Sequence, residues 1–327
     1  MESDGVRVPD PDEYLDVVAL ANEVFRHAEG LRPTMEADLP LLFTPGDTSP
    51  FRVIGPRGAI ASMLGVVVTR ILLMGVTLEV ASIGSVATAA AHRGRGLAGR
   101  LVDAALGESA ERDLVFISGR LGLYTGRGAE PVGSFLEIER VPAQLKADHR
   151  LTTVPYEDHW LDALVAMAQA EPVRWWRSRA LWERLVTVRG RGSADTWIRL
   201  ALLGSEPVGY LVAGMDENRA EVWEYGGSRR ALVTLMASLP VERVVVYPGT
   251  WDLAARHELG TGATVPALGT IFAPDLGRLG ARLAPLAAER ATAPRGSTPG
   301  LSPLAQLFGP RSPSPLPMVW PGCLNYV

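Results

Sequence analysis

The sequence predicts an α/β protein with a mixed sheet, arranged as two similar units in tandem. Three observations lead to this prediction. Short segments rich in β-branched residues follow one another in the first half and are separated by glycine or proline. The last of them runs through an arginine- and glycine-rich turn into an amphipathic helix, after which a further strand follows. A similar order of elements then recurs in the second half.

The first unit is expected to occupy residues 1–148. Apolar residues at helical spacing predict a helix over Asp12–Phe25. Four segments are then expected to be strands, namely Phe51–Ile54, Ile60–Val68, Ile71–Met74 and Leu78–Thr88. The helix Leu97–Gly107 follows, and the strands Leu114–Ser118 and Val132–Glu139 complete the unit.

The second unit is expected to occupy residues 149–275. Two helical stretches are followed by a hairpin, a strand, a helix and a last strand; these are Asp158–Ala170, Pro172–Val186, Trp197–Leu203, Val208–Ala213, Ala220–Tyr225, Ser228–Ser238 and Val241–Val246. Its strand–helix turn, Gly226 to Arg230, lacks the arginine and glycine spacing of the first unit. We therefore interpret the second unit as a degenerate copy. Its tryptophans are assigned to core and domain interface, because each buries a large area.

Residues 276–327 are expected to form a reduced C-terminal segment. A helix is predicted over Leu276–Arg290, and a Pro-rich stretch follows that is unable to build a core of its own. The segment nevertheless ends with several apolar residues, among them Trp320 and Val327. An apolar ending after an extended tether predicts a tail that docks on the N-terminal domain.

Composition excludes several classes of protein. Of the 327 residues, 47% are hydrophobic and 21% are charged, which is ordinary for a globular protein. The net charge of −4 argues against a nucleic-acid-binding protein. Cys323 is the single cysteine, so an internal disulfide and a cysteine-rich zinc site are excluded, and a reducing, cytoplasmic location is expected. Neither a secretory signal nor a stretch able to span a membrane is expected. Lys146 is the single lysine, which removes a Walker-type phosphate loop.

The turn after Thr88 is the most informative feature of the chain. A helix N-terminus leaves backbone N–H groups unpaired and carries positive potential, so it is a ready site for a phosphate or pyrophosphate. Glycine lets the backbone approach such a ligand closely, and arginine adds charge-assisted hydrogen bonds. The residues expected to bind it are Arg93, Gly94, Arg95, Gly96, Leu97, Ala98 and Gly99. A solvated loop and an RNA-contacting fragment are the alternatives.

The spacing Arg93-x-x-Gly96-x-Ala98 resembles the coenzyme A pyrophosphate loop of the GNAT superfamily of N-acetyltransferases. The preceding residues, Val86, Ala87 and Thr88, resemble the strand whose backbone pairs with the pantetheine arm in that family. The resemblance implies acetyl-CoA as co-substrate, without a metal. It also implies direct attack by a primary amine of a small molecule as the reaction.

Two such units in tandem resemble the N-acetyltransferases of the enhanced-intracellular-survival type. That resemblance implies that Tyr124 is the general acid and that the carboxylate of Val327 is the general base. Two departures are visible. The family's third, sterol-carrier-like domain is reduced or absent here, and Gly128-Ala129 replaces the Gly-Phe usually expected after the tyrosine.

The proposed acid suits the chemistry. A phenol with a pKa of about 10 can donate its proton to a leaving thiol with a pKa of about 8.5 as negative charge develops on the sulfur. A structural role for Tyr124 at a strand–helix junction is the alternative. For the whole protein, the alternative is a non-catalytic module that binds or senses acyl-CoA. The identity of the amine and the choice between monomer and homo-oligomer are left open by the sequence.

Overall fold

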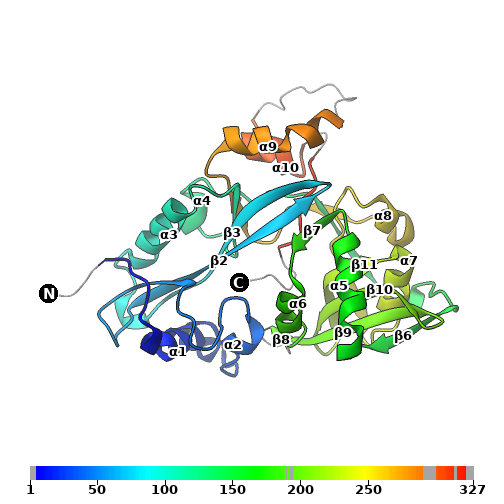
Figure 1. Ribbon diagram of the computed structural model, residues 1–327, viewed down its shortest axis with the longest axis horizontal. Coiled ribbons are helices and arrows are strands. Elements are labelled where there is room, and N and C mark those ends of the chain that lie inside the picture. Colours follow the sequence, from blue (N-terminus) through cyan, green and yellow to red (C-terminus); the bar gives the residue numbers. More distant parts are fainter. Residues whose placement is uncertain (1–4, 189, 192–193, 290–299, 313–314, 322–327) are drawn as a thin grey trace.

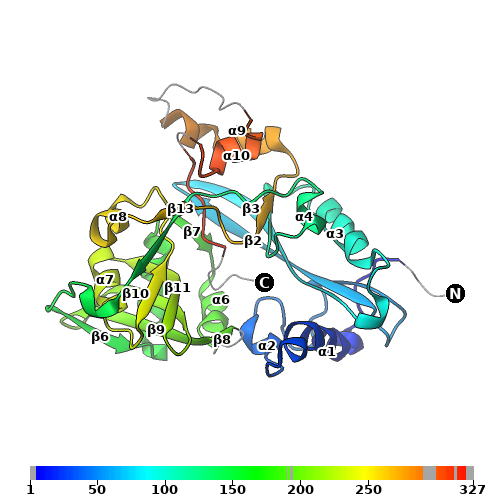
Figure 2. The same cartoon turned by 180° about the vertical axis from the view of Figure 1, so that it is seen from behind.

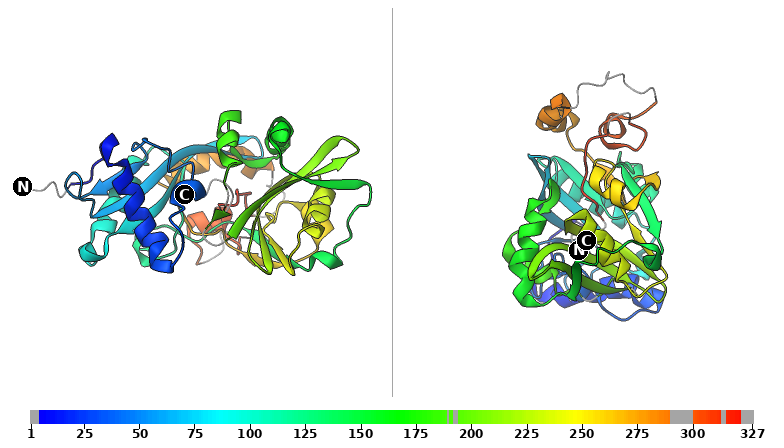
Figure 3. Two further views of the ribbon diagram at one scale, coloured as in Figure 1. Left: turned by 90° about the horizontal axis from the view of Figure 1, so that it is seen from below. Right: turned by 90° about the vertical axis from the view of Figure 1, so that its right-hand side faces the viewer.

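Two mixed β-sheets lie side by side along the long axis of the molecule (Figures 1 and 3). The computed structural model describes residues 5–188, 190–191, 194–289, 300–312 and 315–321. Each sheet has helices on both faces, so the predicted mixed α/β fold class is confirmed. None of the described helices is both long and apolar enough to cross a membrane.

The first sheet has the order β1-β2-β3-β4-β14, and β7 also pairs with β2. The strands are β1 (Phe51–Ile54), β2 (Ser62–Leu73), β3 (Val76–Thr88), β4 (Leu114–Ile117), β7 (Val173–Trp176) and β14 (Thr270–Phe272). Only β3 and β4 run parallel. One face packs on α1 (Tyr14–Phe25) and α2 (Met35–Asp38), and the other packs on α3 (Leu97–Glu108) and α4 (Gly122–Thr125).

The second sheet has the order β13-β5-β12-β11-β10-β9-β6, with β8 paired to β9. Its strands are β5 (Phe135–Arg140), β6 (Leu151–Pro155), β8 (Gly190–Arg191), β9 (Ala194–Leu203), β10 (Glu206–Met215), β11 (Arg219–Gly227), β12 (Arg243–Val246) and β13 (Ala263–Val265). The helices α5 (Leu161–Ala170) and α6 (Arg179–Leu185) cover one face. The helices α7 (Arg229–Ala237) and α8 (Leu253–Leu259) cover the other. Short 3-10 turns are η1 (Pro11–Glu13), η2 (His27–Glu29), η3 (Ala90–His92), η4 (Pro142–Gln144) and η5 (Asp158–Trp160).

The two sheets exchange strands. Strand β5 comes from the first half of the sequence but pairs with β12 and β13 of the second sheet. In return, β7 and β14 come from the second half and pair with β2 and β4 of the first sheet. The strand expected at Val132–Glu139 therefore exists, but its assignment to the first unit is wrong. A single boundary after residue 148 therefore does not separate the strands of the first sheet from those of the second.

Two further elements differ from their sequence-based expectation. The separate strands Ile60–Val68 and Ile71–Met74 are one strand, β2, because the chain turns only at Met74 and Gly75, whose φ angles are 46° and 93°. The helix expected over Pro172–Val186 begins later. Its first residues form β7, whose Trp175 packs on Phe116 of β4 with ring centroids 5.3 Å apart. Tertiary packing of large aromatic side chains decides the local conformation here.

A third layer lies above the junction of the sheets and consists of α9 (Leu276–Glu289) and α10 (Pro303–Phe308) (Figure 2). Both helices and the described tail contribute to one apolar cluster with strands of both sheets. Arg282 Nε lies 2.8 Å from the buried Asp113 Oδ1, which fixes α9 to the start of β4. At the end of the described tail, Trp320 stacks on Tyr247 and contacts the edge of Phe135. The described tail thus packs between the sheets.

Candidate active site

The strands β3 and β4 separate in the middle of the first sheet. Their parallel pairing runs from Val80 and Leu114 to Ile83 and Ile117, and the Ser118 N–H closes it by donating to Ile83 O at 3.1 Å. Strand β3 continues to Thr88 with β2 on its other edge. On the side that faces away from β2, residues 84–88 have no strand partner within the described ranges. An open backbone edge of this kind can pair with an extended ligand.

A β-bulge marks the point of separation. The pairs Gly65–Gly84 and Met63–Ala87 place one more residue on β3 than on β2. Within the bulge, Ser85 adopts a left-handed φ of 50°, which is rare for a residue with a side chain. Its hydroxyl is buried without a hydrogen-bond partner among the described residues. The sequence reasoning passed over Ser85; the serine that interrupts an otherwise apolar strand end is the signal that could have found it.

The predicted phosphate-binding turn connects the end of β3 to α3. Gly94 and Gly96 have φ angles of 76° and 74°, and a Cβ atom at either position would meet nothing within 4 Å. In this described segment, none of the backbone N–H groups of residues 94–99 donates to an acceptor of the protein. The turn therefore presents a row of uncommitted donors at a helix N-terminus, which is the requirement for binding a phosphate group.

The two arginines of the turn contact a backbone carbonyl and a histidine ring. Arg93 Nε donates to the Thr88 carbonyl at 3.3 Å, and Arg95 lies 2.9 Å from Nδ1 of His92. Neither forms an ion pair with a carboxylate of the described chain, and both are exposed. Their positive charge is therefore available to an anionic ligand at the turn.

Tyr124 lies in α4, next to the separation of the strands. It is 6% exposed and packs in the same apolar cluster as Ile83 and Ile117, the last paired residues of β3 and β4. Its ring rests on Gly119, where a Cβ atom would collide with it. The structure therefore brings the end of β3, the turn at residues 93–99 and Tyr124 together where β3 and β4 separate.

Arg127 fixes α4 against α3. Its Nε lies 2.5 Å from Asp103 Oδ1, and its NH1 donates to the Leu123 carbonyl at 2.7 Å. The hydrogen bond from Arg127 holds the pKa of Asp103 below its ordinary value. Because α3 begins at the turn of residues 93–99 and α4 carries Tyr124, this bridge helps to fix the position of Tyr124 relative to the turn.

Two carboxylates bear on the choice of a general base, that of Val327 and that of Glu79. Val327, which the resemblance implies as the base, lies outside the described residues. Glu79 lies in the first half of β3, where Arg112 NH1 donates to it at 2.9 Å and Arg70 lies 3.5 Å away. No group of three or more His, Cys, Asp or Glu side chains in the described chain is arranged to hold a metal ion.

A second separation of parallel strands occurs in the second sheet. The pairing of β11 with β12 ends at Val222 and Val246, and Trp223 forms a bulge against β10 at that point. Strand β11 continues to Gly227 and leads through Ser228 into α7. The second unit thus repeats both the separation and the bulge of the first.

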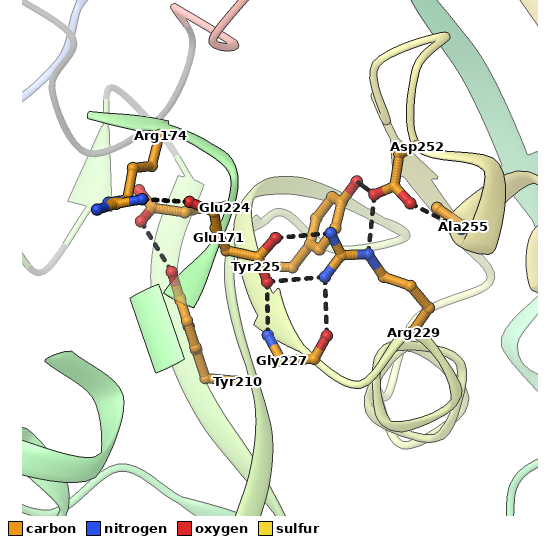
Figure 4. A network of polar contacts seen from close by, with 9 residues as sticks. All are labelled: Glu171, Arg174, Tyr210, Glu224, Tyr225, Gly227, Arg229, Asp252 and Ala255. Carbon is orange, nitrogen blue, oxygen red and sulfur yellow. Dashed lines mark hydrogen bonds and ion pairs between the residues drawn. The ribbon is translucent and has the colours of Figure 1, made fainter. Parts of the chain in front are cut away.

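Carboxylates of the protein occupy the turn of this second separation (Figure 4). Glu171 accepts the Gly227 N–H at 2.8 Å and both terminal nitrogens of Arg229, at 2.8 and 2.7 Å. Asp252 accepts Arg229 Nε at 2.8 Å and the hydroxyl of Tyr225 at 3.0 Å. Burial lowers the pKa of Arg229, but its hydrogen bonds to Glu171 and the neighbouring charges outweigh this and raise it above the ordinary value. The Gly227 N–H and the guanidinium of Arg229 therefore already have acceptors within the protein.

Comparison with known proteins found a family match within the first half of the chain. Residues 6–131 match the acetyltransferase (GNAT) domain family. This range contains β3, the turn at residues 93–99, α3, β4 and Tyr124. No curated protein matches the chain.

Solved structures share the fold over most of the chain. A GCN5-related N-acetyltransferase from Anabaena variabilis is 16% identical, with 83% of this chain and 73% of that chain covered and a TM-score of 0.61. Eis1 from Mycobacterium abscessus is 13% identical, with coverages of 83% and 74% and a TM-score of 0.56. N-myristoyltransferase from Saccharomyces cerevisiae, solved with bound myristoyl-CoA, is 9% identical, with coverages of 82% and 77% and a TM-score of 0.52. At these identities the likeness is one of fold.

Proposed function

We propose that the protein is an N-acetyltransferase that transfers the acetyl group of acetyl-CoA to a primary amine of a small molecule. The observation that carries the proposal is the separation of β3 and β4 beside a helix N-terminus whose backbone donors are uncommitted. It lies within the range that matches the acetyltransferase (GNAT) domain family.

Two parts of the coenzyme would bind here, one at the turn of residues 93–99 and one along the open edge of β3. The pyrophosphate would accept hydrogen bonds from the N–H groups of residues 94–99, with Arg93 and Arg95 supplying positive charge. The pantetheine arm would pair with the open backbone of Val86, Ala87 and Thr88, as an added strand does. The thioester would then lie where β3 and β4 part, near the cluster that contains Tyr124.

The chemistry requires one proton donor for the leaving group. As the amine attacks the thioester carbonyl, the C–S bond breaks and the coenzyme leaves as a thiolate. Tyr124 would protonate that thiolate, which fits its burial at the strand separation. The amine must also lose a proton, and we propose the Val327 carboxylate as the acceptor on the resemblance alone.

Coenzyme release in the presence of amines tests the proposal against a module that only binds acyl-CoA. The protein is incubated with acetyl-CoA and a panel of aminoglycoside, polyamine, peptide and amino-acid amines, and free thiol is measured with time. An acetyltransferase releases coenzyme A only when an accepted amine is present, with one acetylated amine for each thiol. Tight binding of acetyl-CoA without turnover on any amine would favour the sensing module instead.

A further inference from the structure

A cavity of ≈ 90 Å³ lies at the second strand separation, away from the candidate active site. Aromatic side chains supply much of its wall. Trp223 belongs to β11, Tyr247 and Trp251 follow β12, Trp175 comes from β7, and Trp320 from the tail closes one side. No residue of the turn at 93–99 lines it. The cavity is therefore separate from the proposed coenzyme site.

Most charges that line the cavity are neutralised by partners. Arg177 donates to both carboxylate oxygens of Glu224, at 2.6 and 2.9 Å, and Tyr210 donates to the same carboxylate at 3.0 Å. Arg229 and Glu171 belong to the network described above. The two carboxylates of the wall are thus already engaged by the protein.

Arg174 is the exception. The residue is half-buried, and its guanidinium donates a hydrogen bond to the backbone carbonyl of Glu171 (Figure 4). Across the described residues, no carboxylate oxygen lies within ion-pair distance of it. Desolvation lowers the pKa of Arg174, and the charge of Glu171, which Arg229 already binds, offsets this only in part. A partly desolvated cation without an anionic partner gains free energy when an anion is placed beside it.

Two indoles of the wall add unused donors. The Nε1 atoms of Trp251 and Trp320 are buried and have no acceptor in the described structure. A buried donor without an acceptor costs about 1–3 kcal/mol, so an acceptor brought into the cavity would relieve that cost. The cavity therefore has aromatic walls, and the buried side-chain groups of its wall that lack a partner in the described structure are hydrogen-bond donors.

We propose that this cavity is a second ligand site that binds a small aromatic carboxylate, with the carboxylate on Arg174 and the ring among the indoles. The flat apolar body matches the aromatic wall. The anion matches a guanidinium that forms no ion pair within the described residues, and the two wall carboxylates are already bound by other arginines. A cation or a neutral polar molecule would leave Arg174 without a partner.

Phenylacetate is the probe for this site, and phenylacetamide is its uncharged counterpart of nearly the same shape. We expect phenylacetate to bind in calorimetry, to change the tryptophan fluorescence and to raise the Tm, since a ligand that binds only the folded state stabilises it. Phenylacetamide should bind at least about tenfold more weakly, because it lacks the charge.

Three variants complete the test. Arg174→Gln should weaken phenylacetate binding at least about tenfold, whereas Arg174→Lys, which keeps the charge, should lose less. Arg243→Gln is the matched control, because Arg243 lies on the exposed side of β12 in an ion pair with Glu139. Equal affinities for the acid and the amide would overturn the proposal. So would unchanged binding in Arg174→Gln, or no binding of phenylacetate at concentrations on the order of 10 mM. These results are independent of acetyl transfer.

Discussion

The two places where parallel strands separate have the same scaffold and opposite contents. In both, the central strand carries a bulge at the point of separation and leads through a glycine-containing turn into a helix. At β3 the turn exposes donors without acceptors. At β11 the Gly227 N–H of the corresponding turn donates to the carboxylate of Glu171, which also pairs with Arg229. The comparison shows that the scaffold alone does not make an anion site, because an internal carboxylate can satisfy the same donors.

The difference has a simple origin in the sequence. The turn at residues 93–99 contains no acidic or capping side chain, and Gly96 stands at the N-cap of α3. The second turn has Ser228 at the N-cap of α7, where its hydroxyl accepts the Ala231 N–H at 3.4 Å. Glu171 reaches it from the chain segment that follows α5. A helix start that is capped and charge-paired has little left to offer a phosphate.

The largest effect is expected for Tyr124→Phe, which removes only the hydroxyl at the first separation. We expect kcat to fall by about 100- to 10,000-fold, the usual range for a general acid. Coenzyme affinity should stay within a few-fold of wild type, as calorimetry would show. Tyr156→Phe is the control, because it removes another buried hydroxyl from the second half, one that has no hydrogen-bond partner among the described residues. A near-normal kcat for Tyr124→Phe would mean that Tyr124 is structural.

A carboxylate placed in the first turn should make it resemble the second. We expect Gly96→Asp to weaken acetyl-CoA binding about a hundredfold by repulsion of the pyrophosphate, corresponding to about 3 kcal/mol. Gly204→Asp is matched to it, since Gly204 has a φ of 64° and open space around its Cβ position but lies in the β9–β10 hairpin. Titration of the wild-type protein should give one coenzyme per chain. Two bound molecules, or normal affinity in a folded Gly96→Asp, would contradict the comparison.

Removing the internal anion of the second turn should reduce stability and leave coenzyme binding intact. Glu171→Gln weakens a pair whose side chains are only 11% and 12% exposed, and we expect a loss of about 2 kcal/mol in the free energy of unfolding in urea. Glu183→Gln, which disrupts the exposed pair with Arg179, should change it by less than about 0.5 kcal/mol. If both variants unfolded at the same urea concentration, the network at the second turn would be of little energetic importance.

The smallest effect is expected from one glycine added after Val327. The addition moves the terminal carboxylate by about 3.5 Å and leaves the apolar side chains of the tail unchanged. If that carboxylate is the base at the first separation, kcat should fall about tenfold and the pH profile should change. Full activity with an unchanged profile would place the base on a side chain.

The sequence was most informative where local chemistry decides the structure. The turn at residues 93–99 was found because glycine and arginine have defined roles beside a helix N-terminus, and the structure places it directly before α3. The bulge at Ser85 and the closing of the second turn by Glu171 were not predicted. Both depend on strand register and on contacts between residues far apart in the sequence.

The pattern of residues also could not predict which strands pair with one another. The alternation within β5 is the same whether it pairs with β4 or with β12, so its place in the second sheet could not be read from its sequence. The four residues of β7 were mistaken for the start of a helix, since a short aromatic run fits either conformation. The strands β13 and β14, of three residues each, were too short to be expected.

The exchange of strands has a consequence for the order in which the nascent chain can fold. Ile117 of β4 pairs with Thr270 of β14, about 150 residues later in the sequence. At ordinary rates of translation, the edge of β4 waits on the order of ten seconds for its partner to leave the ribosome. During that interval an apolar strand edge is open to pairing with other chains. The sheet that carries the turn at residues 93–99 is therefore completed late in synthesis, although the turn itself is made early.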